Sequence, residues 1–147
     1  LLCGAVATHA SGFPPVASVP SLPPADNATH VRQTQLMFIE AINCGRQVAA
    51  ARGIPWSSLA TQSEPVVRQL VSDNMQHLST CVQGRQAAIN STMARAKQCF
   101  HSIPANTPAA QYDQYSLQCM ERAQPGYLNA MRAIASDPVA NRLQALK

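Results

Sequence analysis

Five cysteines are the residues of this chain best suited to chemistry, and their number indicates which chemistry it is. Cys3 lies in a short apolar stretch at the start, which we interpret as the remnant of a signal peptide. Four cysteines then remain in the mature chain, namely Cys44, Cys81, Cys99 and Cys119. An even number in a small secreted chain is typical of disulfides, whereas a catalytic cysteine is a lone thiol beside a base. We therefore predict two structural disulfide bonds.

Two histidines near cysteines raise the alternative of a metal site or an activated thiolate. His77 precedes Cys81 by four residues, and His101 follows Cys99 by two. These spacings match none of the usual zinc-ligand patterns. The sequence also lacks the G-x-S-x-G and H-E-x-x-H motifs, a glycine-rich phosphate loop and the spacing of a calcium-binding loop. We expect no metal, no cofactor and no enzymatic activity.

The cysteines must be positioned by helices, because apolar residues recur at spacings of three and four over most of the chain. Helix stops such as Gly53 before Pro55 separate the segments. No stretch of useful length alternates apolar and polar residues as a half-buried strand does. We predict an all-α fold, a small antiparallel bundle of four to five helices crosslinked by two disulfides. The expected helical segments are residues 29–53, 63–103, 109–123 and 127–146, the last with a break at Asp137-Pro138.

The spacing of Cys81 and Cys99 constrains the disulfide pairing. Eighteen residues are five helical turns, so on one continuous helix the two would lie about 27 Å apart, whereas a disulfide requires Cα atoms within about 7 Å. Each would then bond a cysteine on a neighbouring helix, and we predict Cys44–Cys81 and Cys99–Cys119. The region forms either one long helix or two helices broken near Gly84, and such a break would allow Cys81 to bond Cys99 instead.

The chain divides into three parts. We expect residues 1–10 to be the signal-peptide remnant, residues 11–28 a proline-rich linker, and residues 29–147 the helical domain. Asn27 and Asn90 each stand two residues before a threonine, which makes both of them N-glycosylation sequons. Together with the even cysteine count, these features predict a secreted, extracellular glycoprotein.

Charged residues make up only 12% of the 147 residues, and the net charge is +4. The arginines are scattered singly, with no run of basic residues. Nucleic-acid binding needs clustered positive charge with stacking or groove-entering groups, so we expect none. No stretch approaches the roughly twenty apolar residues of a transmembrane helix, so we also expect no membrane span.

Two sets of residues are candidates for binding. Tyrosine and arginine are frequent in protein-binding hot spots, which favours a surface for a protein partner, although the tyrosines could equally anchor the last helices. This first set is Tyr112, Tyr115, Arg122 and Tyr127. Large apolar side chains on the first two helical segments could line a cavity for a lipid or another apolar ligand, or simply fill the core. This second set is Phe38, Ile42, Met93 and Phe100.

The segment AQYDQYSLQCMERAQPGYL, with Cys81 and Cys99 before it, resembles the secreted TsetseEP-type family of insects. The resemblance implies a helical, cysteine-linked and often glycosylated extracellular protein, in a setting such as gut, saliva or reproductive fluid. This chain has fewer cysteines than that family leads us to expect. The resemblance therefore transfers neither a disulfide pairing nor site residues.

From these observations we expect a secreted, non-enzymatic helical glycoprotein that binds another macromolecule, as an interaction partner or inhibitor. One alternative is a carrier of a small apolar ligand or lipid in the helical core. Another is a structural component of an extracellular coat or matrix, which the alanine- and glutamine-rich, weakly charged composition favours.

Overall fold

The computed structural model describes residues 23–146, and every regular element in this range is a helix. The predicted all-α fold is therefore confirmed. No helix among these residues is both long and apolar enough to span a membrane. The elements are α2 (Pro24–Ala51), the 3-10 helix η2 (Trp56–Ala60), α3 (Glu64–Asp73), α4 (Met75–Ser102), α5 (Ala109–Ala123), α6 (Tyr127–Ala135) and α7 (Pro138–Ala145).

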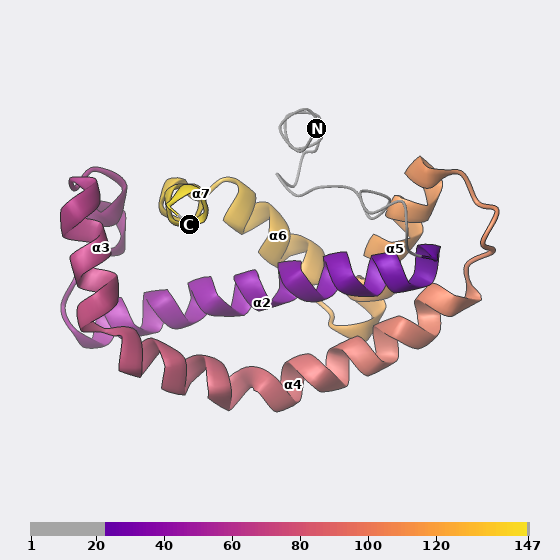
Figure 1. The fold of residues 1–147 in the computed structure, drawn as a ribbon, viewed down its shortest axis with the longest axis horizontal. Helices are drawn as coiled ribbons and strands as arrows, with labels where there is room; N and C mark the ends of the chain where they lie inside the picture. Colours follow the sequence, from indigo (N-terminus) through magenta and orange to yellow (C-terminus); the bar gives the residue numbers. More distant parts are fainter. Residues whose placement is uncertain (1–22, 147) are drawn as a thin grey trace.

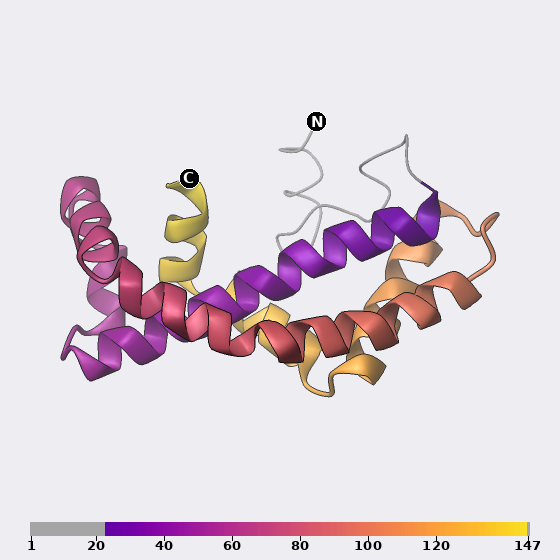
Figure 2. The ribbon, with the colours of Figure 1, turned by 60° about the horizontal axis from the view of Figure 1, so that its bottom comes forward.

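Helices α2 and α4 form the scaffold of the molecule. Each has 28 residues, and the two run antiparallel along its longest axis (Figure 1). Helix α5 packs against α4 and α2 near one end of this pair. Helices α3 and α7 stand at the opposite end and rise from the same side of the scaffold (Figure 2). The two ends of the molecule are therefore built differently.

Both predicted disulfides are present. Cys44 on α2 bonds Cys81 on α4, with a Cα–Cα distance of 5.8 Å. Cys99 on α4 bonds Cys119 on α5, with a Cα–Cα distance of 5.6 Å. The bonds tie α4 to a different neighbour near each of its ends, as the antiparallel arrangement requires.

The main hydrophobic core lies between α2, α4, α5 and α6. Its fully buried members include Leu36, Ile39, Phe100 and Met120. A smaller cluster between η2, α3 and α7 is centred on three buried residues, Leu59, Val67 and Val139. Two cores of unequal size give the α3 and α7 end much less buried apolar area than the α5 end.

A buried polar network joins α2 to α5 and α6 inside the main core. The Arg32 guanidinium donates hydrogen bonds to Asp113 Oδ1 (2.6 Å), Ser116 Oγ (3.0 Å) and Gln35 Oε1 (2.7 Å). The Tyr127 hydroxyl donates to the same Gln35 oxygen. Burial raises the pKa of Tyr127 to about 12, so the phenol stays neutral. The network fixes the relative register of the three helices.

Two predicted boundaries were wrong. Helix α2 begins at Pro24 rather than at residue 29, since Pro24 occupies the first helical position, where proline is favourable. The long region 63–103 is divided at Asn74 and continues unbroken through Gly84. At the end of α3 the Leu70 carbonyl accepts from the backbone N–H of Asn74 (3.2 Å) and also from its side-chain amide (2.8 Å). The expected signal-peptide remnant, residues 1–10, and residues 11–22 of the expected linker lie outside the described residues.

Candidate functional site: an apolar pocket between α2, α3 and α7

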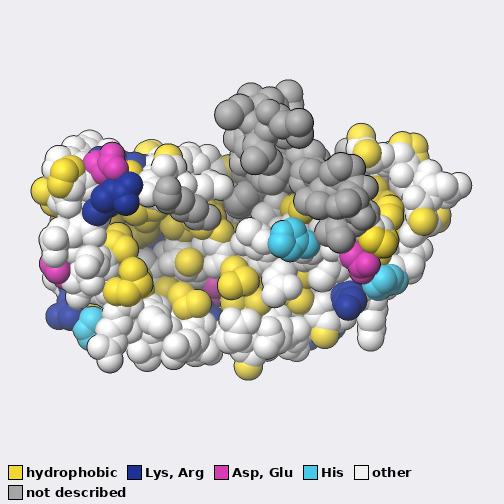
Figure 3. Space-filling model, viewed as in Figure 1, with side chains coloured by type: hydrophobic (Ala, Val, Ile, Leu, Met, Phe, Trp, Pro, Cys, Tyr) yellow, Lys and Arg dark blue, Asp and Glu magenta, His cyan; other side chains and the backbone are white. Residues whose placement is uncertain are grey.

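An apolar pocket of about 530 Å³ lies at the end of the molecule where α3 and α7 stand. Figure 3 shows hydrophobic side chains gathered in a hollow between these helices, with one basic and one acidic side chain beside it. Pockets for small molecules commonly have volumes of about 300–1,000 Å³ and mostly apolar walls. The size and lining of this pocket therefore match those of a small-molecule site.

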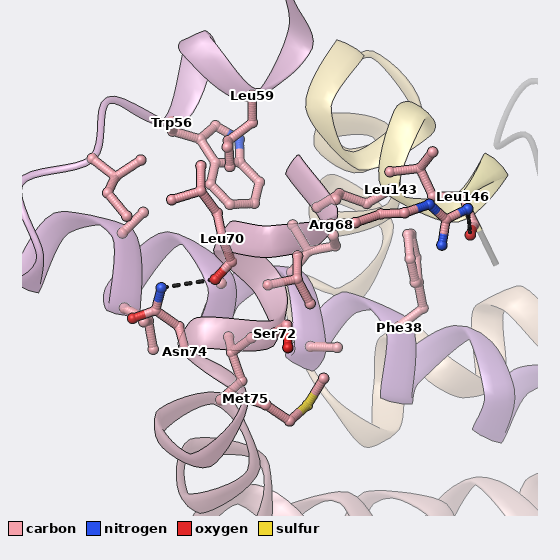
Figure 4. A pocket seen from close by; sticks show the side chains of 18 residues that line it. Phe38, Trp56, Leu59, Arg68, Leu70, Ser72, Asn74, Met75, Leu143 and Leu146 are labelled. Carbon is pink, nitrogen blue, oxygen red and sulfur yellow. Dashed lines mark hydrogen bonds between the residues drawn. The ribbon is translucent and has the colours of Figure 1, made fainter. Parts of the chain in front are cut away.

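Helix α2 forms the long wall of the pocket. Its side chains there recur at spacings of three and four, the period that places them on one helical face. Figure 4 shows the remaining walls, to which η2, α3, α4 and α7 contribute Trp56, Leu70, Met75 and Leu143. The α2 residues that line the pocket are Phe38, Ala41, Ile42, Gly45, Val48 and Ala49.

Gly45 lets the Trp56 ring approach α2. A Cβ atom at position 45 would lie 3.2 Å from Cζ3 of the indole, closer than ordinary van der Waals contact. A glycine inside a helix costs about 1 kcal/mol relative to alanine, so its presence here reflects the packing of the ring. Trp56 is the single tryptophan of the chain, and it packs against both hydrophobic clusters.

Asp137 holds Trp56 in the pocket wall. The indole Nε1 donates to Asp137 Oδ2 (3.0 Å), and Arg46 donates to the same oxygen while its guanidinium lies 5.5 Å from the indole centroid. The other oxygen of Asp137 accepts from the Val139 amide (2.9 Å) and caps α7. Burial alone would raise the pKa of Asp137, but these hydrogen bonds together hold it below its usual value.

Few polar groups reach the pocket. Arg68 stands at its rim with 55% of its side chain exposed. Its Nε donates to Glu64 Oε1 (2.9 Å) and its Nη2 to the Leu146 carbonyl (2.9 Å), so the side chain bridges α3 and α7 (Figure 4). Ser72 and Asn74 also line the pocket, and the Asn74 amide is already bonded to the Leu70 carbonyl.

The Cys44–Cys81 disulfide lies beside the pocket. Cys44 directly precedes Gly45, and Cys81 follows the lining residue Leu78 by three positions. The bond clamps α2 to α4 where both contribute to the cavity, so the walls are held together covalently.

The residues predicted to bind an apolar ligand are divided between two places. Phe38 and Ile42 line the pocket. Met93 and Phe100 lie in the main core, 6% and 0% exposed, and are not among the lining residues. The structure therefore separates the predicted set and brings Phe38 and Ile42 together with Trp56, Leu70 and Leu143 instead.

The residues predicted to bind a protein partner do not form one exposed surface. Tyr112 is 3% exposed and donates to the Phe100 carbonyl (3.0 Å), while Tyr127 is fully buried in the network around Arg32. Tyr115, 43% exposed, and Arg122 remain at the surface of α5. The structure supports the anchoring role for Tyr112 and Tyr127.

The two sequons also differ in their surroundings. Asn27 is 3% exposed and its side-chain oxygen has no hydrogen-bond partner, so a glycan at this position does not fit the folded domain. Asn90 is exposed on α4 and accepts a hydrogen bond from Gln86. Glycosylation at Asn90 stays a prediction.

The cysteines near His77 and His101 are not available as metal ligands, because both form disulfide bonds. His77 itself contacts Arg52. Within residues 23–146 no group of three or more histidine, cysteine or acidic residues could hold a metal ion.

No protein-family model matches the chain, and neither the curated proteins nor the solved structures include a significant match to it. The resemblance to the TsetseEP-type family therefore stays a prediction.

Sequence reasoning missed Trp56, Arg68 and Leu143 as parts of one site. Two signals pointed to Trp56, and none to Arg68 or Leu143. Trp56 is a lone tryptophan just after Pro55, and Gly45 interrupts an otherwise good helix-forming segment. Neither signal says which helix the indole contacts, because that depends on the tertiary arrangement.

Proposed function

We propose that this protein is a secreted carrier of a small apolar ligand, which it binds in the pocket between α2, η2, α3, α4 and α7. The observation that carries the proposal is the pocket itself, with its volume of about 530 Å³ and its almost entirely apolar lining. At about 30 Å³ for each water-sized group, this volume corresponds to on the order of 15–20 non-hydrogen atoms.

The exposed apolar area at the pocket supports this use. Met75, one of the lining residues, is 53% exposed, and it adjoins a pocket that residues 23–146 leave unfilled. Burying apolar area against a ligand contributes about 25 cal/mol per Å², so an apolar molecule gains free energy by occupying it. Secretion is supported by the two disulfides, which persist in oxidising compartments.

Binding of another macromolecule, the function favoured from the sequence, has weaker support in the geometry. Two of its four predicted residues, Tyr112 and Tyr127, are core residues. Tyr115 and Arg122 lie seven positions apart on α5, which places them on one exposed face. That face is the part of the proposed partner surface that a partner could still reach.

The test of the carrier function is a titration with dodecanol, a neutral apolar ligand of suitable size, followed by the emission of Trp56. We expect saturable one-to-one binding. Ala41→Phe places a ring in the pocket and should weaken binding by about tenfold or more, since losing contact with two or three methylenes costs roughly 2 kcal/mol. Ala50→Phe, on an exposed position of α2 that does not line the pocket, is the matched control.

The carrier function would be contradicted if the Trp56 emission of the wild-type protein showed no saturable binding of dodecanol. It would also be contradicted by an Ala41→Phe protein that binds dodecanol as tightly as the Ala50→Phe protein does.

A further inference from the structure

Arg68 is the one charged residue among those that line the pocket within residues 23–146. It projects from α3 at the rim and reaches toward the end of α7, close to Leu143 and Leu146 (Figure 4). A single positive charge at the mouth of an apolar cavity has the arrangement that an amphipathic ligand requires, with the tail buried and the head at the surface.

The guanidinium of Arg68 retains donors for a further acceptor. A guanidinium carries five N–H groups. In Arg68, Nε and Nη2 donate to Glu64 and the Leu146 carbonyl, while Nη1 makes no hydrogen bond to the described residues. These two contacts place the guanidinium at the rim of the pocket, where a ligand would meet its free donor groups.

The existing ion pair does not block such a ligand. The side chains of Arg68 and Glu64 are 55% and 54% exposed, and the pair is separated by one helical turn. Exposed pairs of this kind are weak, because water screens both charges. An incoming anion can therefore bind Nη1 or replace Glu64 at little cost. The nearby Glu64 charge favours a head with one negative charge over a doubly charged phosphate.

We propose that the ligand is a carboxylate amphiphile, such as a medium- to long-chain fatty acid, with its tail in the pocket and its carboxylate bound by Arg68. The match rests on chemistry, since a guanidinium donates strong charge-assisted hydrogen bonds to a carboxylate, here through Nη1 and, where the ligand replaces Glu64, through a second nitrogen. This inference rests on the carrier function proposed above and specifies the class of its ligand.

The test compares dodecanoate with dodecanol, which share a chain length and differ in the head group. The quantity measured is the ratio of their affinities, by calorimetry and by Trp56 emission, in the wild type, in Arg68→Gln and in Arg122→Gln. Arg122 is exposed on α5 and does not line the pocket, so Arg122→Gln makes the same charge change elsewhere.

We expect Arg68→Gln to lower the dodecanoate-to-dodecanol affinity ratio about tenfold, and Arg122→Gln to leave it within about twofold of the wild type. Dodecanol binding to Arg68→Gln reports whether the pocket itself survives the substitution. Arg68 is exposed, so the variant is expected to fold.

The outcomes separate the two proposals. A ratio that is the same in Arg68→Gln and the wild type, with dodecanol still bound, overturns the carboxylate inference and leaves the carrier function intact. An Arg122→Gln protein whose dodecanoate-to-dodecanol affinity ratio falls as much as that of Arg68→Gln also overturns the inference, because the effect then comes from the net charge of the protein. Failure of dodecanol to bind the wild type overturns the carrier function, and the inference with it.

Discussion

Asp137 shows at the scale of one residue how the pocket wall is held. Its two carboxylate oxygens are shared between the Trp56 indole, the Arg46 guanidinium and the first turn of α7. An amide has one acceptor oxygen where the carboxylate has two, so asparagine cannot satisfy all of these donors. The carboxylate therefore couples η2 to α7 across the pocket.

We expect Asp137→Asn to lower the free energy of unfolding at neutral pH by about 2–3 kcal/mol, because a buried donor loses a charged acceptor. The pKa of Asp137 is lowered in the fold, so its contribution is fully present above the pKa of an unfolded aspartate, about 3.9, and is lost as the pH falls through the folded value. Urea unfolding between about pH 7 and pH 2.5, followed by circular dichroism, measures both effects.

Asp73→Asn is the control for this measurement, since Asp73 is an exposed acid at the end of α3. It should leave neutral stability within about 0.5 kcal/mol of the wild type. An Asp137→Asn protein that loses stability below about pH 4 as steeply as the wild type would contradict the role given to this carboxylate.

Residue types predicted burial less well than they predicted helices. Tyr112, Tyr115 and Tyr127 looked alike in the sequence, yet two are core residues and one is exposed. The difference depends on which face α5 and α6 turn toward α2, which local spacing does not determine. The same holds for Arg32, since an arginine in a weakly charged chain gives no sign that Asp113 and Ser116 lie opposite it.

At the scale of elements, the cysteine pairing was predictable from the length of an unbroken helix together with the antiparallel course of its neighbours. Cys81 and Cys99 lie eighteen residues apart on α4, and at a rise of about 1.5 Å per residue they are too far apart to bond each other. Each therefore bonds a cysteine on a neighbouring helix. The break at Asn74 was not predictable in the same way. The apolar residues continue the helical period on both sides of Asn74, and nothing in that pattern marks the residue whose side-chain amide bonds the Leu70 carbonyl at the end of α3.

The two disulfides should differ in their effect on the pocket. Their sequence separations are 37 and 20 residues, for which loss of either bond is expected to cost about 3–4 kcal/mol by the chain-entropy relation. We expect the Cys44→Ala/Cys81→Ala protein to lose dodecanol affinity as well, because this bond lies beside the cavity. The Cys99→Ala/Cys119→Ala protein should keep it.

Urea unfolding gives the stability of each double variant, and the Trp56 titration, made under conditions where each is folded, gives its affinity. Equal losses of dodecanol affinity in the two double variants would show that the Cys44–Cys81 bond has no particular part in shaping the pocket.

At the scale of the whole molecule, the two ends differ, since one holds the larger hydrophobic core and the other holds the pocket. The α5 end contains the large core and the buried polar network, whereas the α3 and α7 end has a smaller cluster centred on three buried apolar residues, Leu59, Val67 and Val139. The sequence predicted the scaffold from its periodicity. It did not predict the hollow end, because that end is assembled from five separate segments, including the 3-10 helix η2.

The most direct test of the carrier function is to locate a bound ligand by nuclear magnetic resonance. Nuclear Overhauser effects would be measured between dodecanol and the methyl groups of isotope-labelled protein. The proposed carrier function predicts contacts to Val71, Leu78 and Leu143, which line the pocket on three different helices. Contacts to the core residues Ile89 and Met93 instead, or none at saturating dodecanol, would contradict it.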